Sequence, residues 1–422
     1  MRVLMLSASP GNGHNSTALK MKNKILSTHK DAEIKIVDMY KQFGSKLKAW
    51  TMEQGYTLAC NHIVGIYNYF FKKSEKSNYA TRDKSNANKE TFPMLYGLLK
   101  EIYDYKPDLI ICTYIFTAVA ITNLKRCYDI PAKVVCMTLD YGISPYWECA
   151  TAMDKMFVTD KYMVSPFLER GFKRKQLVVS GIPVGDEFSI ETNKKEARKK
   201  CGLDTDMFTL MVTRSSFFAI KNKQLIQEFA KIKKPIQIVI CNGSDKKGKE
   251  QLDHLIAKTK LPHKIFNKGY IPTEEFGLLF SSADMMLAKG GGLTLTEAMT
   301  KAIPVIIINK LPKQEIYNRD YLVEKGCALG VDKKNSVSTQ INKVIENPKI
   351  YKDLIKNIKK IRKTNVLNTF LTHFEKFPTA DYSKIQSLTD TPKQLVNKIN
   401  KSRKHAIKEE KCKNLQKISR KN

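Results

Sequence analysis

A glycine-rich segment in the second half of the chain has the residue types that bind a phosphorylated ligand. Three glycines, Gly290 to Gly292, follow an apolar run and precede the helix-like stretch Leu293–Ala298. Free N–H groups at the start of a helix, together with the positive end of its dipole, stabilise an anion such as a diphosphate. Glu297, less than two turns into this helix, could accept hydrogen bonds from both hydroxyls of a ribose. The alternative is a tight turn followed by an exposed helical glutamate.

A polar pair after the next apolar run suits a sugar. The run Pro304–Asn309 is a predicted strand, and Gln314 and Glu315 stand at the start of the helix expected after it. Amide and carboxylate groups there can form hydrogen bonds with sugar hydroxyls. The alternative is that the two residues form a plain helix cap.

A histidine in the first half is the candidate catalytic base. His14 follows the predicted strand Arg2–Ser7 through a loop that contains Gly11 and Gly13. The loop lacks the third glycine of a dinucleotide fingerprint and the Gly-Lys-Ser/Thr of a P-loop. A flavodoxin-like phosphate loop with a structural histidine is the alternative. Asp140, at the end of another predicted strand, is the reserve candidate for the base.

The elements that must position these residues follow an alternating pattern. Apolar strand-like runs alternate with helical patterns, which is typical of parallel α/β sheets. The pattern breaks near residues 186–205 and then begins again. We therefore expect two doubly wound, Rossmann-like domains that face a central cleft at the carboxyl ends of their strands. The expected ranges are 1–190 for the first domain, 200–375 for the second and 380–422 for a basic tail.

Several of these segments together resemble a known family. The run from Gly269-Tyr270-Ile271 through the glycine segment to Gln314-Glu315 and Tyr321-Leu322-Val323 resembles the carboxyl-terminal domain of family 28 glycosyltransferases. With Gly11–Ser16 and Val179–Val184, the chain is most similar to the diacylglycerol glycosyltransferases, which include plant monogalactosyldiacylglycerol synthases and bacterial processive diacylglycerol glucosyltransferases. The resemblance covers about residues 1–365. It implies a GT-B fold with an amino-terminal lipid-acceptor domain and a carboxyl-terminal UDP-sugar domain.

The resemblance also implies individual roles. The backbone around Tyr270 and Ile271 would hold the base of UDP, Glu297 the ribose, and Gln314 with Glu315 the hexose. His14 would be the catalytic base or a contact to the donor. The remaining expected donor-binding residues are Gly291, Gly292, Leu293 and Thr294 at the diphosphate, together with Gly13, Arg214 and Gly243.

Two departures from the family pattern affect the donor site. Gly290 stands where the family usually has proline, which should loosen the turn without removing N–H donors. The loop Thr213–Phe218 lacks the glycines expected after the first strand of the second domain, and Arg214 could replace them as a charge. The one Asp-x-Asp pair, Asp204-Thr205-Asp206, comes before the first strand of the second domain, and no such pair is placed to hold a divalent metal beside the diphosphate. We therefore expect neither a metal nor another cofactor.

The charge indicates an anionic partner. The formal net charge is +32, spread over the body and the tail. Such a charge favours an anionic membrane surface or nucleic acid, and a general lysine bias is the alternative. Residues 42–92 mix aromatic and basic side chains, which suits a lipid acceptor and a bilayer surface. A helical core piece with a charged outer face is the alternative for this segment.

Membrane association is expected to be peripheral, at the cytoplasmic face. The uncharged stretch after Asp108 is slightly too short to span a bilayer and reads as a buried strand followed by a short helix. The amino terminus lacks the features of a signal peptide. Nine cysteines without a C-x-x-C pair predict neither a disulfide framework nor a zinc site.

The expected activity is therefore inverting transfer of a hexose, glucose or galactose, from a UDP-sugar to diacylglycerol or a glycosyl-diacylglycerol. The alternative in the same family is a UDP-N-acetylglucosamine transferase that acts on a polyprenyl-linked cell-wall precursor. Its first loop is richer in glycine than the loop before His14. A basic nucleic-acid-binding protein would explain the charge, but zinc, RNP and Gly-x-x-Gly motifs are missing, and nucleic acid is not expected as a partner.

Overall fold

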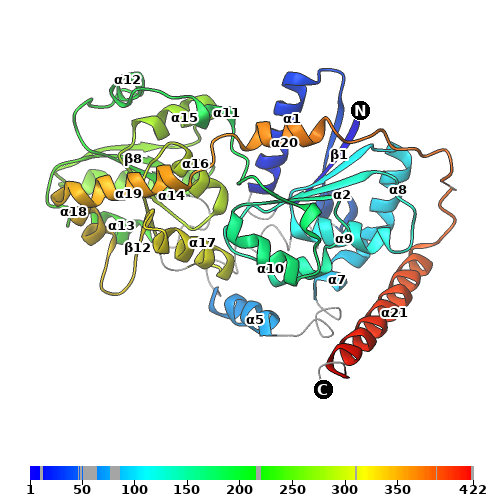
Figure 1. Ribbon diagram of the computed structural model, residues 1–422. Coiled ribbons are helices and arrows are strands. Elements are labelled where there is room, and N and C mark those ends of the chain that lie inside the picture. The colour runs from blue at the N-terminus through cyan, green and yellow to red at the C-terminus, as the bar shows by residue number, and fades with distance from the viewer. Residues whose placement is uncertain are drawn as a thin grey trace.

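The computed structural model describes residues 1–9, 13–45, 47, 50, 64–76, 86–214, 220–308, 311–385 and 387–419. The chain forms two α/β domains side by side, with the helices packed around two parallel sheets (Figure 1). The two expected doubly wound domains are thus confirmed.

The first domain has a six-stranded parallel sheet in the order β2-β1-β3-β4-β5-β6. Its strand order reverses between β1 and β3, which makes this point the natural ligand site of the sheet. The strands β1 and β3 are runs of buried aliphatic residues, as expected for a sheet covered on both faces. The strands are β1 (Arg2–Ser7), β2 (Glu33–Asp38), β3 (Leu109–Cys112), β4 (Lys133–Met137), β5 (Lys155–Val158) and β6 (Leu177–Val179). The helices are α1 (Gly13–Thr28), α2 (Met39–Phe43), α7 (Asn86–Thr91), α8 (Leu95–Tyr105), α9 (Ile115–Lys125) and α10 (Val164–Glu169).

The second domain has a parallel sheet in the order β12-β11-β10-β7-β8-β9, with the reversal between β7 and β10. Strand β12 was not predicted, because Ala328-Leu329-Gly330 contains no β-branched or aromatic residue that favours a strand. The strands are β7 (Thr209–Thr213), β8 (Gln237–Cys241), β9 (Lys264–Lys268), β10 (Met285–Ala288), β11 (Val305–Ile307) and β12 (Ala328–Gly330). The helices are α12 (Lys194–Lys200), α13 (Asn222–Phe229), α14 (Lys246–Lys258), α15 (Thr273–Ser282), α16 (Gly292–Thr300), α17 (Lys313–Glu324), α18 (Val337–Glu346) and α19 (Pro348–Ile361).

Beyond α19 the chain crosses back to the first domain. Helix α20 (Val366–Phe374) packs there: the rings of Phe370 and Phe157 are 5.7 Å apart, and those of Phe374 and His29 are 5.1 Å apart. The crossover therefore lies before residue 375, where the second domain was expected to end. The chain then follows the first domain to α21 (Pro392–Ser419), the long helix at the lower right of Figure 1.

The basic tail is thus helical and attached. Leu395 and Ile399 on α21 are fully buried in the core of the first domain, and the guanidinium of Arg403 lies 5.4 Å from the ring centre of Phe92. These contacts fix the first half of α21 to the first domain.

The segment expected to meet the membrane contributes helix α5 (Val64–Lys76), which lies below α17 in Figure 1. Asn68 donates a hydrogen bond to the Leu311 carbonyl (3.0 Å), and the rings of Phe71 and Tyr317 are 6.4 Å apart. A first-domain segment thus packs on the second domain. Residues 46, 48–49, 51–63 and 77–85 of the same segment lie outside the described residues.

The uncharged stretch after Asp108 forms β3 and α9, which confirms the predicted strand and short helix. Within the part of the chain that the structure describes, no helix combines the length and the apolar character needed to cross a bilayer.

Candidate active site

His14 lies at the point where the order of the first sheet reverses. It stands in the first turn of α1, and its Nδ1 is 2.6 Å from the carbonyl oxygen of Thr113, just after β3. Because a carbonyl only accepts, Nδ1 carries the hydrogen, and Nε2 of the neutral ring keeps a free lone pair. Burial lowers the pKa of His14 to about 4, although the hydrogen bond to Thr113 opposes the shift. The ring is therefore neutral near pH 7 and can accept a proton.

The start of α1 is held by short polar contacts. Ser7 donates to Asn15 (2.5 Å), and Ser9 donates to Asp38, which ties the loop after β1 to the end of β2. Gly13 is the first residue of α1, and a Cβ at this position would have no described atom within 4 Å. Gly11 and Asn12 of the predicted loop lie outside the described residues.

An aromatic wall, Tyr114, Phe116 and Tyr146, extends from His14. The ring of Tyr114 is 4.7 Å from that of His14, Phe116 lies 5.3 Å from Tyr114, and Tyr146 lies 5.7 Å from Phe116. The sequence reasoning missed this wall, although two of its rings follow β3 directly. An apolar wall beside the candidate base suits an acceptor with an apolar body.

Asp140, the reserve candidate, follows β4 and touches the second domain. Its Oδ1 accepts a hydrogen bond from Nδ2 of Asn318 on α17 (2.8 Å). Burial raises the pKa of Asp140, and the bond from Asn318 opposes that shift. The structure thus places this carboxylate where the two domains meet.

Helix α16 begins at Gly292, within the glycine segment, as the sequence predicted. The first helical hydrogen bond runs from Leu295 N–H to the Gly291 carbonyl (3.1 Å), so the N–H groups of Gly292, Leu293 and Thr294 precede it and point out of the helix end. A Cβ on Gly292 would lie 2.1 Å from the carbonyl oxygen of Leu139 in the first domain. Glycine is therefore required there by the close approach of the other domain.

Gly290 has a similar constraint. A Cβ at this position would lie 2.4 Å from the carbonyl oxygen of Glu315. The glycine that replaces the family's usual proline therefore lets the start of α17 approach the turn before α16.

Glu297 lies one turn further along α16 and is buried. Its Oε1 is 2.7 Å from Nζ of Lys20, which projects from α1 of the first domain. Burial raises the pKa of Glu297, and Lys20 opposes the shift. The carboxylate predicted to hold ribose thus has a cationic partner from the opposite domain.

Gln314 and Glu315 stand in the first turn of α17. Oε1 of Glu315 is 2.7 Å from Nζ of Lys289, which immediately precedes the three glycines. Oε2 of Glu315 is buried and has no hydrogen-bond partner among the described residues. A buried acceptor without a donor is costly, so Oε2 is suited to a hydroxyl of a bound ligand.

Asn318, one turn after Gln314, was not predicted. Its Oδ1 accepts hydrogen bonds from the N–H groups of Tyr141 (2.6 Å) and Gly142 (3.2 Å), and its Nδ2 also donates to the Gly290 carbonyl (2.8 Å). The amide joins the loop after β4 to both donor-side helices. The only feature of the sequence that could have indicated Asn318 as a site residue is its four-residue spacing from Gln314, which places both on one face of the helix.

The other predicted donor residues lie at the carboxyl ends of β7, β8 and β9. Arg214 follows β7 and donates to Oδ1 of Asn242 (2.8 Å), and burial lowers its pKa. Gly243 follows β8 with φ +57°, which glycine adopts without strain. After β9, Tyr270 is 78% exposed, whereas Ile271 packs against the core.

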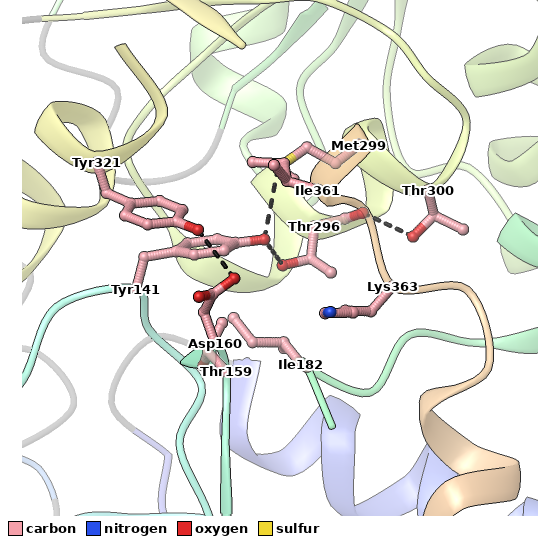
Figure 2. Close-up of a pocket in the computed structure, with 11 residues that line it drawn as sticks. Tyr141, Thr159, Asp160, Ile182, Thr296, Met299, Thr300, Tyr321, Ile361 and Lys363 are labelled. Atoms are coloured by element: carbon pink, nitrogen blue, oxygen red, sulfur yellow. Dashed lines mark hydrogen bonds between the residues drawn. The ribbon is translucent and has the colours of Figure 1, made fainter. Parts of the chain in front are cut away.

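Three tyrosines, Tyr141, Tyr162 and Tyr321, form a stack that joins the domains; we call them the tyrosine junction. Tyr321 of α17 lies between the two first-domain rings, with centroids 5.0 Å from each. Figure 2 shows its hydroxyl directed at Asp160 (3.0 Å), and the Tyr141 hydroxyl directed at Thr296 (2.9 Å). The junction therefore fixes α17 and α16 relative to the first domain.

Replacing Tyr321 by alanine should lower turnover by about tenfold or more and should weaken UDP binding by a smaller factor. The reason is that the stack holds the two halves of the site in register, and small misplacements are costly to catalysis. Steady-state kinetics and a UDP titration measure the two quantities. Tyr382→Ala is the matched control, because Tyr382 bonds to the Pro107 carbonyl away from the junction. Unchanged turnover in Tyr321→Ala would contradict the prediction.

No cluster of three or more His, Cys, Asp or Glu side chains able to hold a metal ion occurs within the described ranges. The site as described consists of helix-start N–H groups, paired carboxylates and a neutral histidine.

Comparison with known proteins shows what each domain is similar to. Residues 14–184 match the family described as monogalactosyldiacylglycerol (MGDG) synthase, and residues 193–361 match glycosyl transferases group 1. A processive diacylglycerol beta-glucosyltransferase of Bacillus licheniformis is 26% identical over 385 residues, which cover 88% of this chain and 93% of that protein. The protein of the same name from Staphylococcus aureus strain JH9 is 26% identical over 336 residues, with 77% and 80% covered.

Solved structures show the same fold. MurG of Acinetobacter baumannii superposes with a TM-score of 0.58 at 13% identity, and 89% of this chain and 100% of that chain are covered. Anabaena Alr3699/HepE in complex with UDP gives 0.52 at 14% identity, with 89% and 99% covered. The two family matches lie on the two domains, and the chain is thus a glycosyltransferase with the GT-B fold whose sequence is similar over most of its length to diacylglycerol glycosyltransferases.

Proposed function

We propose that this protein transfers a hexose from a UDP-sugar to diacylglycerol or a glycosyl-diacylglycerol at a membrane surface. The observation that carries the proposal is the contact between the domains, which brings the helix starts of α16 and α17 against the loop after β4. The relatives named processive diacylglycerol beta-glucosyltransferase, and the MGDG synthase match over the first domain, support a diacylglycerol acceptor.

In the proposed reaction each described group has one task. The N–H groups at the start of α16 hold the diphosphate and stabilise the charge that develops on it as UDP leaves. Glu297 holds the ribose, and Gln314 with the free Oε2 of Glu315 holds the hexose. Nε2 of His14 takes the proton of the acceptor hydroxyl, a role worth roughly 10²–10⁴-fold in rate. Attack opposite the leaving UDP inverts the anomeric carbon and gives a β-linked product.

The test is a product assay. Purified protein is incubated with UDP-glucose, UDP-galactose or UDP-N-acetylglucosamine and with liposomes that contain either diacylglycerol or a polyprenyl diphosphate acceptor. The lipids are then identified by mass spectrometry and anomeric NMR. We expect a β-hexosyl-diacylglycerol. Transfer of N-acetylglucosamine to a polyprenyl diphosphate acceptor, without transfer to diacylglycerol, would show that the cell-wall alternative is correct.

We also propose that donor binding needs no divalent metal, since helix-start N–H groups supply the positive charge at the diphosphate. Calorimetric titration of UDP in excess chelator should give the same affinity as titration with Mg²⁺. Binding that disappears in chelator and returns with Mg²⁺ or Mn²⁺ would contradict this account.

We further propose that the protein binds the cytoplasmic face of an anionic membrane peripherally. Ile66 and Tyr69 of α5 are 55% and 65% exposed, and Lys72 and Lys73 beside them are exposed too. Apolar rings and chains flanked by lysines suit a bilayer interface with anionic head groups.

Vesicle sedimentation tests the membrane proposal. High salt should release the protein from vesicles with anionic lipid, because the attraction between lysines and head groups is screened. Ile66→Ser with Tyr69→Ser should weaken vesicle binding by about fivefold or more. Ile190→Ser is the matched control, because Ile190 is 62% exposed but follows α11 (Asp186–Ser189) at the opposite edge of the molecule in Figure 1. Equal losses in both variants would count against α5 as the docking helix.

A further inference from the structure

The first domain supplies a buried cation to the donor side of the cleft. Lys20 lies on α1, six residues after His14, and its Nζ is 2.7 Å from Oε1 of Glu297 on α16. The two side chains are only 14% and 7% exposed. The ammonium also lies 5.3 Å from the ring centre of Phe188, which leaves Lys20 little freedom to point elsewhere.

The charge on Glu297 depends on this lysine. Removal from water disfavours a carboxylate, and burial is the largest influence that raises the pKa of Glu297. Glu187 on α11 raises it further by repulsion, whereas Lys20 lowers it by charge and by hydrogen bonding. Lys20 is the one cation found to act on Glu297 within the described part of the chain. Without it, a buried carboxylate would face a second carboxylate and no positive charge.

The pair leaves part of the carboxylate free. Lys20 bonds to Oε1, and no hydrogen bond to Oε2 of Glu297 occurs among the described residues. A carboxylate oxygen has two lone pairs, so Oε2 and the second lone pair of Oε1 can still accept hydroxyl hydrogens. The lysine thus orients the carboxylate and leaves several of its lone pairs available to accept hydrogen bonds.

We infer that Lys20 is a positioning residue of the donor site, through which the acceptor domain fixes the Glu297 carboxylate for the ribose hydroxyls. This inference rests on the proposed function, which assigns Glu297 to the ribose of UDP. Its consequence is that the ribose site is complete only when the two domains are in contact. UDP binding and domain contact then favour each other, because each stabilises the same arrangement of Glu297.

Calorimetric titration of UDP into the full chain tests the inference. Lys20→Met removes the charge but keeps most of the side chain, and it should weaken UDP binding by about tenfold or more. Lys20→Arg should remain within a few-fold of the wild type. Lys24→Met is the matched control: Lys24 lies on the same helix and pairs across the same contact with the exposed Asp186 (3.5 Å), and its loss should change UDP affinity by less than about threefold.

A pH profile separates the charge role from a structural one. UDP binding requires ionised Glu297, so affinity is present above the pKa of Glu297 and is lost as pH falls through it. In Lys20→Met, burial and Glu187 raise this pKa without opposition, so the acidic loss of affinity should move to higher pH. Titration of UDP itself cancels in the comparison of the variants. If Lys20 only stabilised the fold, Lys20→Met would lower the melting temperature but would not change the pH at which UDP affinity is lost.

The outcomes are distinct. Tighter UDP binding by Lys20→Met would show that the ion pair blocks the ribose site, and unchanged affinity would show that Lys20 plays no part in it; either result overturns the inference. Failure of the wild-type chain to bind UDP would instead overturn the proposed function.

Discussion

Replacement of His14 by alanine is expected to lower turnover by roughly 10²-fold or more while UDP affinity stays within a few-fold. His14 belongs to the first domain and its Nδ1 is committed to the Thr113 carbonyl, so Nε2 is the nitrogen left for the acceptor proton. The ribose and hexose contacts proposed here lie on the other domain. Steady-state kinetics with diacylglycerol liposomes and UDP calorimetry on the same preparation separate the two effects.

Asp140→Ala is the comparison for this prediction. Near-normal turnover in His14→Ala together with loss of turnover in Asp140→Ala would assign the base to Asp140. Loss of UDP binding in His14→Ala would make His14 a donor ligand instead. His14→Asn should behave like His14→Ala in turnover, because an amide can bond to Thr113 but is no base.

The pH dependence of the wild-type rate provides a further check. Burial lowers the pKa of His14 to about 4, so the base is available above this pH and is lost as pH falls through about 4. With a catalytic histidine of ordinary pKa, the rate would fall near pH 6.5. The acidic fall in kcat at saturating UDP-hexose, where weaker donor binding through Glu297 does not contribute, should therefore lie near pH 4, and His14→Asn should lack it.

Replacement of Glu297 by alanine is expected to weaken UDP binding by one or more orders of magnitude. Each hydrogen bond between a ribose hydroxyl and a charged carboxylate is worth about 1.5–3 kcal/mol at most. The variant also leaves the buried Lys20 without its partner, which lowers the stability of the fold. Calorimetry with UDP measures the loss, and thermal unfolding shows whether the fold is retained.

Glu315→Ala is the matched control for this result. Glu315 is also a buried glutamate paired with a lysine, Lys289, but it is assigned to the hexose rather than the ribose. Its removal should leave UDP affinity within a few-fold and weaken the binding of UDP-hexose relative to UDP. Equal effects of Glu297→Ala and Glu315→Ala on UDP binding would contradict this division of roles.

Much of the framework could be predicted because its signals are local. Apolar runs and the helical patterns between them gave the two sheets and almost all of their strands, since a strand buried on both faces must be apolar along its length. The three glycines at the start of α16 predicted where this helix begins, because a helix start depends only on neighbouring residues. Strand β12 and the crossover to α20 were not predicted, because Ala328-Leu329-Gly330 lacks strand-favouring residues and a packing partner has no local signal.

The chemistry of the site depends on pairs that sequence patterns do not reveal. Lys20 and Glu297 are 277 residues apart, Asp140 and Asn318 are 178 apart, and Asp160 and Tyr321 are 161 apart. Each pair bridges the two domains, so it exists only through their relative placement. Residue types, their spacing and the resemblance to family 28 together predicted which groups would hold a UDP-sugar. The packing of one domain on the other decided which carboxylates are paired, which oxygen of Glu315 is free and which nitrogen of His14 can take a proton, because burial and partner distance set the charge and hydrogen bonding of each group.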